Sequence, residues 1–165
     1  MTPTHPPFGW LARGLALVAF LSACQNAPAT GVPPDFRIDF ERGPCFGTCP
    51  VYALTVGADG SVVYDGRQFV ETQGERTASL TESQLQELVD AVRSTDFFGL
   101  ADRYTVPATD LPSITLSVTM DGRTKTVDHY GAGCGTDFDT APPELCDLEE
   151  RVESIPISYG WLSSP

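Results

Sequence analysis

The stretch Gly43-Pro44-Cys45-Phe46-Gly47-Thr48-Cys49-Pro50-Val51-Tyr52 decides where the first β-hairpin of this chain begins. Two of its residues, Cys45 and Cys49, lie four positions apart between prolines, and a strand pattern follows directly. A disulfide between them requires the chain to turn, because an extended chain would hold their Cα atoms too far apart. Gly47 makes that turn easy, since glycine lacks a Cβ atom. We predict a disulfide-closed corner whose role is structural.

Alternating apolar and polar residues on both sides of this corner predict strands. Residues 36–41 alternate before it and residues 52–56 alternate after it, which is typical of strands with one buried face. Residues 58–60, Ala-Asp-Gly, fit a three-residue hairpin loop. In that register Val56 faces Val62, so both strands place apolar side chains on the same face.

The region after this hairpin predicts a strand and then a helix. We expect a strand over 67–72, a turn around Gly74 and an extended piece over 77–80. A helix over 82–93 follows, because Thr81 and Gln84 together form a capping box. The apolar stripe of this helix consists of Leu85, Leu88, Val89 and Val92.

A second hairpin and a second helix complete the predicted domain. Residues 114–120 alternate before an Asp121-Gly122 turn, and counting across it places His129 opposite Ile114, on the inner face. Loops are expected over 104–113 and 130–141. The second helix should begin at Pro142 or Pro143 and stop at Pro156, with a buried stripe of Leu145, Leu148, Val152 and Ile155.

These elements predict an α+β fold class. We expect a single domain in which antiparallel β-hairpins form one sheet and two α-helices pack on one face. Trp161, in the tail after the second helix, should pack back onto this domain.

The N-terminal segment predicts export and lipidation. Arg13 supplies a positive charge, and residues 15–21 form an apolar run that is too short to span a bilayer. Leu21-Ser22-Ala23-Cys24 resembles the lipobox of bacterial lipoproteins, whose signal peptidase requires small residues before an acylated cysteine. An ordinary secretory leader or a buried core segment is the alternative.

This leader gives the expected domain organisation. We predict a lipoprotein signal peptide over 1–23, a lipidated Cys24 with an Ala/Pro-rich linker over 24–34, and a globular domain over 35–165. Acyl chains such as palmitate on Cys24 would anchor the protein to a bilayer. Gln25 favours the outer membrane if the source is Gram-negative, facing the periplasm or the outside.

The charge of the chain limits its partners. The sequence has 165 residues with 22 acidic and 10 basic side chains, a net charge of −12. Removing residues 1–23 takes away one arginine and no acid, which leaves 9 basic residues and a net charge of −13. Nucleic acid is excluded as a partner, because phosphate binding requires a positive surface.

Four cysteines besides Cys24 favour disulfides in an exported protein. Three pairings are possible, and we prefer Cys45–Cys49 and Cys134–Cys146. A zinc site made of the four thiolates is the rival. It is disfavoured because Cys-x-x-x-Cys is a poorer ligand spacing than Cys-x-x-Cys and because oxidation competes with metal binding. The Cys45/Cys49 pair could instead exchange thiols, but redox motifs place two residues between the cysteines, before a helix.

His129 and Asp110 are the other functional candidates. His129 is the only histidine after the leader, and either Asp110 or Asp128 could orient it toward a serine nucleophile, Ser113 or Ser117. No G-x-S-x-G elbow presents a serine, however, so a packed histidine at a strand end is preferred.

The remaining motifs predict neither a cofactor nor a metal. Asp137 and Asp139 could hold calcium, but no EF-hand loop surrounds them. The sequence contains no P-loop, dinucleotide fingerprint or His-Glu-x-x-His motif. We therefore name no catalytic, cofactor or metal residues.

The chain resembles an uncharacterised family of bacterial envelope lipoproteins that share a domain of unknown function. Cys-Phe-Gly-Thr-Cys-Pro-Val-Tyr over 45–52 matches the C-F-G-x-C-P-x-Y signature of that family. The similarity continues through the turns at 59–60 and 64–66, the predicted helix and residues 125–130. The resemblance implies a fold unit and a location in the cell envelope, but no reaction.

The sequence therefore predicts a membrane-anchored envelope lipoprotein that acts as a non-catalytic binding or structural module. Its expected partners are the lipid bilayer, through the acyl anchor, and another envelope protein. The alternative is an envelope enzyme, either a hydrolase using His129 or a thiol oxidoreductase using Cys45 and Cys49. A broad apolar patch on the open face of the sheet would favour the binding module.

Overall fold

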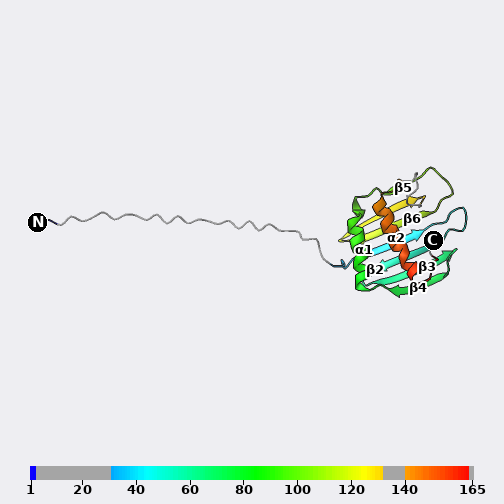
Figure 1. Cartoon of the computed structure of the whole chain (residues 1–165), viewed down its shortest axis with the longest axis horizontal. Helices are drawn as coiled ribbons and strands as arrows, with labels where there is room; N and C mark the ends of the chain where they lie inside the picture. Colours follow the sequence, from blue (N-terminus) through cyan, green and yellow to red (C-terminus); the bar gives the residue numbers. More distant parts are fainter. Residues whose placement is uncertain (3–30, 132–139, 164–165) are drawn as a thin grey trace. The chain divides into compact units, whose positions relative to one another are not determined.

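The structure is a computed structural model that describes residues 1–2, 31–131 and 140–163. The elements of these residues, most of which are labelled in Figure 1, are β1 (Arg37–Arg42), β2 (Val51–Gly57), β3 (Ser61–Gln68), β4 (Gly74–Ser79), α1 (Glu82–Ser94), the 3-10 helix η1 (Phe97–Gly99), β5 (Arg103–Thr105), β6 (Ser113–Met120), β7 (Arg123–Tyr130) and α2 (Pro143–Ser158). The predicted α+β class is confirmed.

The strands form one seven-stranded sheet in the order β4-β3-β2-β1-β6-β7-β5. The prediction of a purely antiparallel sheet is wrong at one edge, because β5 pairs with β7 in parallel. Most of β5 lies in the segment 104–113, for which the sequence predicts a loop. Three residues are too few to show an alternating pattern, and their pairing, Tyr104 opposite His129, is created only when β7 lies beside them.

Both hairpin registers are confirmed. Val56 lies opposite Val62 across the first hairpin, and Ile114 lies opposite His129 across the second. Gly60 has φ of 78°, which is the left-handed conformation that the first turn requires. The central strand β1 then joins the two hairpins by pairing with both β2 and β6.

The predicted strand over 67–72 is wrong. β3 runs on to Gln68, and β4 begins at Gly74, where it already pairs with Gly66. Phe69 adopts a left-handed conformation with φ of 53°. Because an apolar residue in this conformation cannot continue a strand, the chain leaves the sheet there and returns at β4.

The start of α1 is confirmed and the end of α2 is corrected. Thr81 and Gln84 form the capping box in both directions. α2 does not stop at Pro156 but continues to Ser158. A proline removes one helical N–H, and the carbonyl of Pro156 accepts a bond from the backbone N–H of Trp161 at 2.9 Å, which supports the last turn.

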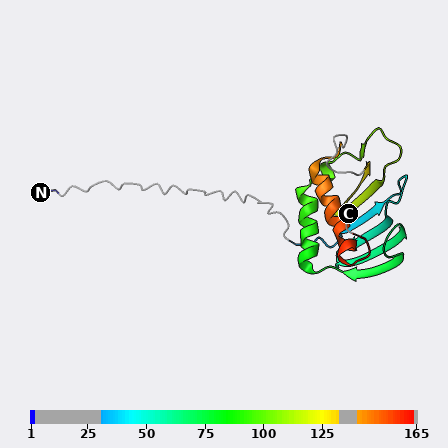
Figure 2. The same ribbon diagram turned by 45° about the vertical axis from the view of Figure 1, so that its right-hand side comes forward.

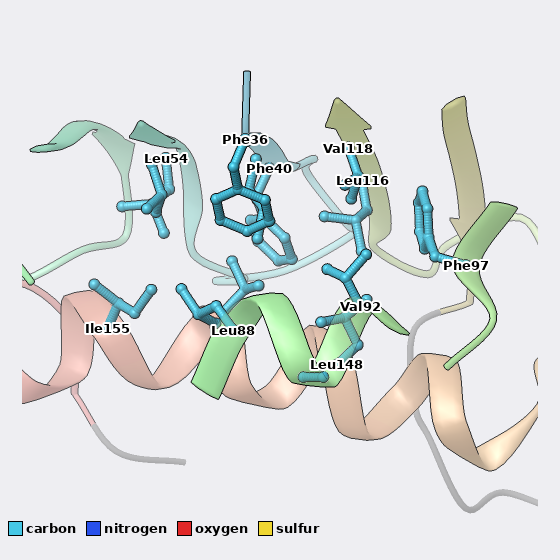
Figure 3. Close-up of a cluster of buried hydrophobic side chains, with 14 of the residues drawn as sticks. Phe36, Phe40, Leu54, Leu88, Val92, Phe97, Leu116, Val118, Leu148 and Ile155 are labelled. Atoms are coloured by element: carbon cyan, nitrogen blue, oxygen red, sulfur yellow. The ribbon is translucent and has the colours of Figure 1, made fainter. Parts of the chain in front are cut away.

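The core lies between the sheet and the two helices (Figure 2). On the sheet side, Phe40 lies in register with both Leu54 and Leu116, and all three side chains are buried. Figure 3 shows the side chains that meet them from α1 and α2, which are Leu88, Val92, Leu148 and Ile155. Trp161 packs back as predicted, with its ring 5.2 Å from that of Tyr64.

The other face of the sheet is polar. Arg37 pairs with Asp39 at 2.6 Å, and Arg103 pairs with Asp128 at 3.3 Å. Hydroxyls join β6 to β7, for example Thr119 to Thr124 at 2.9 Å. The broad apolar patch that would favour a binding module is therefore not found on this face of the described sheet.

Asp35 joins the start of the domain to the second hairpin turn and makes the fold sensitive to acid. Its carboxylate accepts bonds from the N–H groups of Gly122 at 2.6 Å and Asp121 at 3.1 Å. These bonds, that from Gly122 above all, hold the pKa of the Asp35 carboxyl below its ordinary value of 3.8. Because the pKa is lower in the folded state, this stabilisation is complete above about pH 4 and is lost as the pH falls through the folded pKa.

We therefore expect Asp35→Asn to lower Tm at pH 7 and to lower it less at pH 2. Calorimetry across this pH range checks the prediction, with Glu87→Gln on the exposed side of α1 as the control. A Tm difference that stays constant from pH 7 to pH 2 would contradict it.

Candidate functional site

A row of polar side chains crosses the inner face of the sheet where most of its connecting loops gather. His129 on β7 lies opposite Ile114 on β6, which lies opposite Arg42 on β1, which in turn lies opposite Tyr52 on β2. Residues in register on adjacent strands point to the same face. The strands alone therefore place a histidine, an arginine and a tyrosine in one row above the core, with Ile114 between the histidine and the arginine.

α2 supplies two carboxylates to this row. Glu149 and Glu153 are four residues apart, which places them on one face of the helix. His129 Nδ1 lies 2.9 Å from Glu149 Oε2. Both side chains are almost completely buried, with 1% and 2% of their surfaces exposed. This pair ties the end of β7 to α2 from inside the domain.

Glu153 makes the second polar contact between α2 and the sheet. Its Oε1 pairs with Arg42 Nη1 and accepts a hydrogen bond from Tyr52 Oη at 3.0 Å. Burial raises the pKa of the Tyr52 hydroxyl, and the neighbouring Glu153 carboxylate raises this pKa further. Tyr52 therefore remains a neutral hydrogen-bond donor, and the arrangement stabilises packing between α2 and strands β1 and β2.

The disulfide-closed corner lies directly beyond Arg42. Cys45 and Cys49 are bonded, with their Cα atoms 5.8 Å apart, as predicted. Backbone N–H groups attach the corner to the segment before β6, since Gly43 donates to Ser113 O at 2.8 Å and Phe46 donates to Asp110 O at 3.1 Å. The corner is thus fixed both by its own disulfide and by a neighbouring loop.

The structure does not assemble a Ser-His-Asp triad from the predicted residues. Ser113, Ser117 and Asp128 alternate with the inward-facing residues of their strands, so they point to the open face, away from His129. Asp128 instead binds Arg103 and Thr115 there. Asp110 is exposed in the loop before β6, where its carboxylate accepts a bond from Thr109.

The cysteine predictions divide between described and undescribed residues. Cys45–Cys49 is present, and a strand rather than a helix follows it. Cys146 on α2 is disulfide-bonded, but its predicted partner Cys134 lies outside the described residues, so that pairing stays a prediction. Cys24 and the weak calcium candidates Asp137 and Asp139 also lie outside them.

The described surface offers a small groove between the helices. It has a volume of about 160 Å³ and is lined by Gln84, Glu87, Arg151 and Ser154 together with Leu80, Leu88, Ile155 and Ser158. Binding sites for drug-sized molecules are larger and mostly apolar. Neither His129 nor the Cys45–Cys49 disulfide lines this groove, so it brings no candidate residue to solvent.

Glu149 and Arg42 were not predicted as members of this polar cluster, although the sequence carried a signal for both. Glu149 occupies the i+4 position of the stripe that begins at Leu145, where an apolar residue is expected. Arg42 likewise occupies the next inward position after Phe40 on β1. A charged residue in a buried slot of either pattern predicts a buried partner, because an unpaired charge there would be costly.

Two further properties concern the described part of the chain. Within it, no group of three or more His, Cys, Asp or Glu side chains is arranged to hold a metal ion. Neither of its α-helices is long and apolar enough to cross a bilayer.

A comparison with curated proteins finds no match to this chain. A family model described as "Domain of unknown function (DUF6438)" matches residues 36–156. The matched region contains the disulfide-closed corner, all seven strands of the sheet, α1 and most of α2. Because it covers more than half of the 165 residues, this chain belongs to the family described as Domain of unknown function (DUF6438).

Proposed function

We propose that this protein is a lipid-anchored component of the bacterial cell envelope whose domain binds another envelope component without catalysing a reaction. The observation that carries the non-catalytic part is the His129–Glu149 pair, since the histidine best suited to acid–base chemistry is buried against a carboxylate. A general base must reach the proton that it removes from a substrate. A histidine with 1% of its surface exposed does not do so.

The location is supported by the chemistry of the cysteines. Leu21-Ser22-Ala23-Cys24 places small residues before a cysteine at the end of a short apolar run. Disulfides at Cys45–Cys49 and at Cys146 are typical of proteins that fold in an oxidising compartment. Together they favour export, acylation of Cys24 and attachment to a membrane by a linker of about ten residues.

Replacing Cys24 with alanine tests the anchor. In bacteria that express the full chain, we expect the unaltered protein to sediment with membranes and Cys24→Ala to be lost from the membrane fraction, because it cannot be acylated. Thiol counting on the denatured, unreduced protein should find no free cysteine.

A Cys45→Ser/Cys49→Ser double variant is the control, since it loses a structural disulfide and keeps the acylated residue. The proposal fails if Cys24→Ala sediments like the unaltered protein. It also fails if the unaltered protein is found in the cytosol with reduced thiols.

A further inference from the structure

Three exposed apolar side chains gather at one end of the sheet, which we call the loop end. They are Phe46, Phe69 and Leu111, with 89%, 54% and 38% of their surfaces exposed. Phe46 lies in the corner between β1 and β2, Phe69 follows β3, and Leu111 precedes β6. Val51 at the start of β2 lies opposite Gln68 at the end of β3. The connections that carry Phe46 and Phe69 therefore leave the sheet at the same end.

The third connection leaves the sheet at the same end. The backbone N–H of Phe46 donates to Asp110 O at 3.1 Å, so the loop that carries Leu111 lies against the corner. At the opposite end of the sheet, the hairpin turns carry exposed acidic residues, Asp59 and Asp121. Three of the exposed large apolar side chains of the described domain therefore lie at one end of the sheet, whereas Val63 and Tyr159 lie elsewhere.

Phe46 is held rigidly in its exposed position. The Cys45–Cys49 disulfide closes the loop around it, and the backbone of Gly47 donates to Cys45 O at 3.0 Å within the same loop. The neighbouring loop is also fixed, since Tyr130 Oη accepts a bond from the N–H of Leu111 at 3.3 Å. An aromatic ring presented on a rigid backbone loses little conformational entropy on binding.

The charges around the loop end are negative. Asp110 and Glu71 are exposed there and have no cationic partner within the described chain, and Glu71 accepts only a bond from Ser163. Two nearby cations are neutralised, because Arg67 pairs with Glu41 and Asp65, and Arg42 pairs with Glu153. Arg76 on β4 donates to the backbone carbonyl of Glu75 at 2.7 Å. A complementary surface would be apolar at its centre and basic at its rim.

We propose that the loop end docks into an apolar, basic-rimmed pocket on another envelope protein, with Phe46 as the anchor side chain. This inference rests on the proposed function, because it requires the domain to be exported. Exposed aromatic residues that fill a partner's pocket commonly dominate the affinity of an interface.

The same observations disfavour two other binding partners for the loop end, an anionic membrane and a second copy of this chain. An anionic membrane would repel the exposed carboxylates of Asp110 and Glu71 at the loop end. A second copy of this chain would bring two acidic loop ends together.

Site-specific photo-crosslinking in intact cells tests the proposal. A photoreactive phenylalanine analogue replaces Phe46 or Phe69 in the full chain, and Val63 in the middle of the open face is the matched control with 38% exposure. We expect one protein adduct from positions 46 and 69 and none from position 63. A lipid adduct, an adduct of twice the mass of the chain, or equal yields at all three positions would overturn the proposal.

The partner identified in the adduct is then purified, and its Kd for the full chain is measured. Phe46→Ala should weaken binding about 30-fold, the effect typical of losing an anchor residue, whereas Val63→Ala should leave the Kd unchanged. Affinity should also fall as salt rises, because a basic rim is screened. Unchanged binding by Phe46→Ala would refute the anchor role, and its high exposure makes misfolding an inadequate explanation.

Failure of this inference is distinguishable from failure of the proposed function. If the protein is anchored through Cys24 but position 46 forms no protein adduct, only the docking proposal fails. If Cys24→Ala remains in the membrane fraction, the lipid anchor fails whatever the crosslinking shows.

Discussion

Glu149→Ala is expected to lower the free energy of unfolding by about 3 kcal/mol, because it leaves His129 buried without its carboxylate partner. The two side chains lie 2.9 Å apart and are nearly inaccessible to water, so solvent cannot replace the lost contact. Urea denaturation followed by circular dichroism measures the change.

Glu150→Ala is the matched control for this prediction. Glu150 is the next residue of α2 and is exposed, so its replacement should change stability by less than about 0.5 kcal/mol. A His129→Leu/Glu149→Leu double variant should be more stable than Glu149→Ala, because it replaces both buried polar side chains with apolar ones. If Glu149→Ala and Glu150→Ala unfold at the same urea concentration, the pair does not stabilise the fold.

Phe40→Ala is expected to cost about 3–5 kcal/mol, the range found when a buried aromatic ring is removed from a core. Phe40 is on the central strand β1, it is 1% exposed, and its neighbours in register are Leu54 and Leu116. Its ring also stacks on Tyr52 at a centroid distance of 5.8 Å. The remaining cavity would be surrounded by strands that are fixed on both sides, so it can collapse only in part.

The comparison for Phe40→Ala is Val63→Ala on the exposed face of β3. It removes apolar atoms from a strand without opening a cavity, and we expect a loss of less than about 0.5 kcal/mol. Chemical denaturation of both variants gives the difference. If both variants lost the same free energy of unfolding, the Phe40 side chain would not be important for the stability of the core.

Local patterns were sufficient for the fold class and for most of the described elements. The Ala-Asp-Gly loop over 58–60 and the Asp121-Gly122 turn set both hairpin registers, because each turn type accepts only one pairing of the flanking strands. The capping box at Thr81 likewise marked the start of α1. These features depend on residues that are close together in the chain.

Only the tertiary structure decided the rest. β5 becomes a strand because it pairs with β7, and β3 ends where the backbone turns out of the sheet at Phe69. The His129–Glu149 contact joins residues 20 positions apart, and the Arg42–Glu153 contact joins residues 111 positions apart. No local sequence pattern specifies which buried charged side chains will pair with each other. The choice is made when α2 packs across the strands and each buried charge must find a partner.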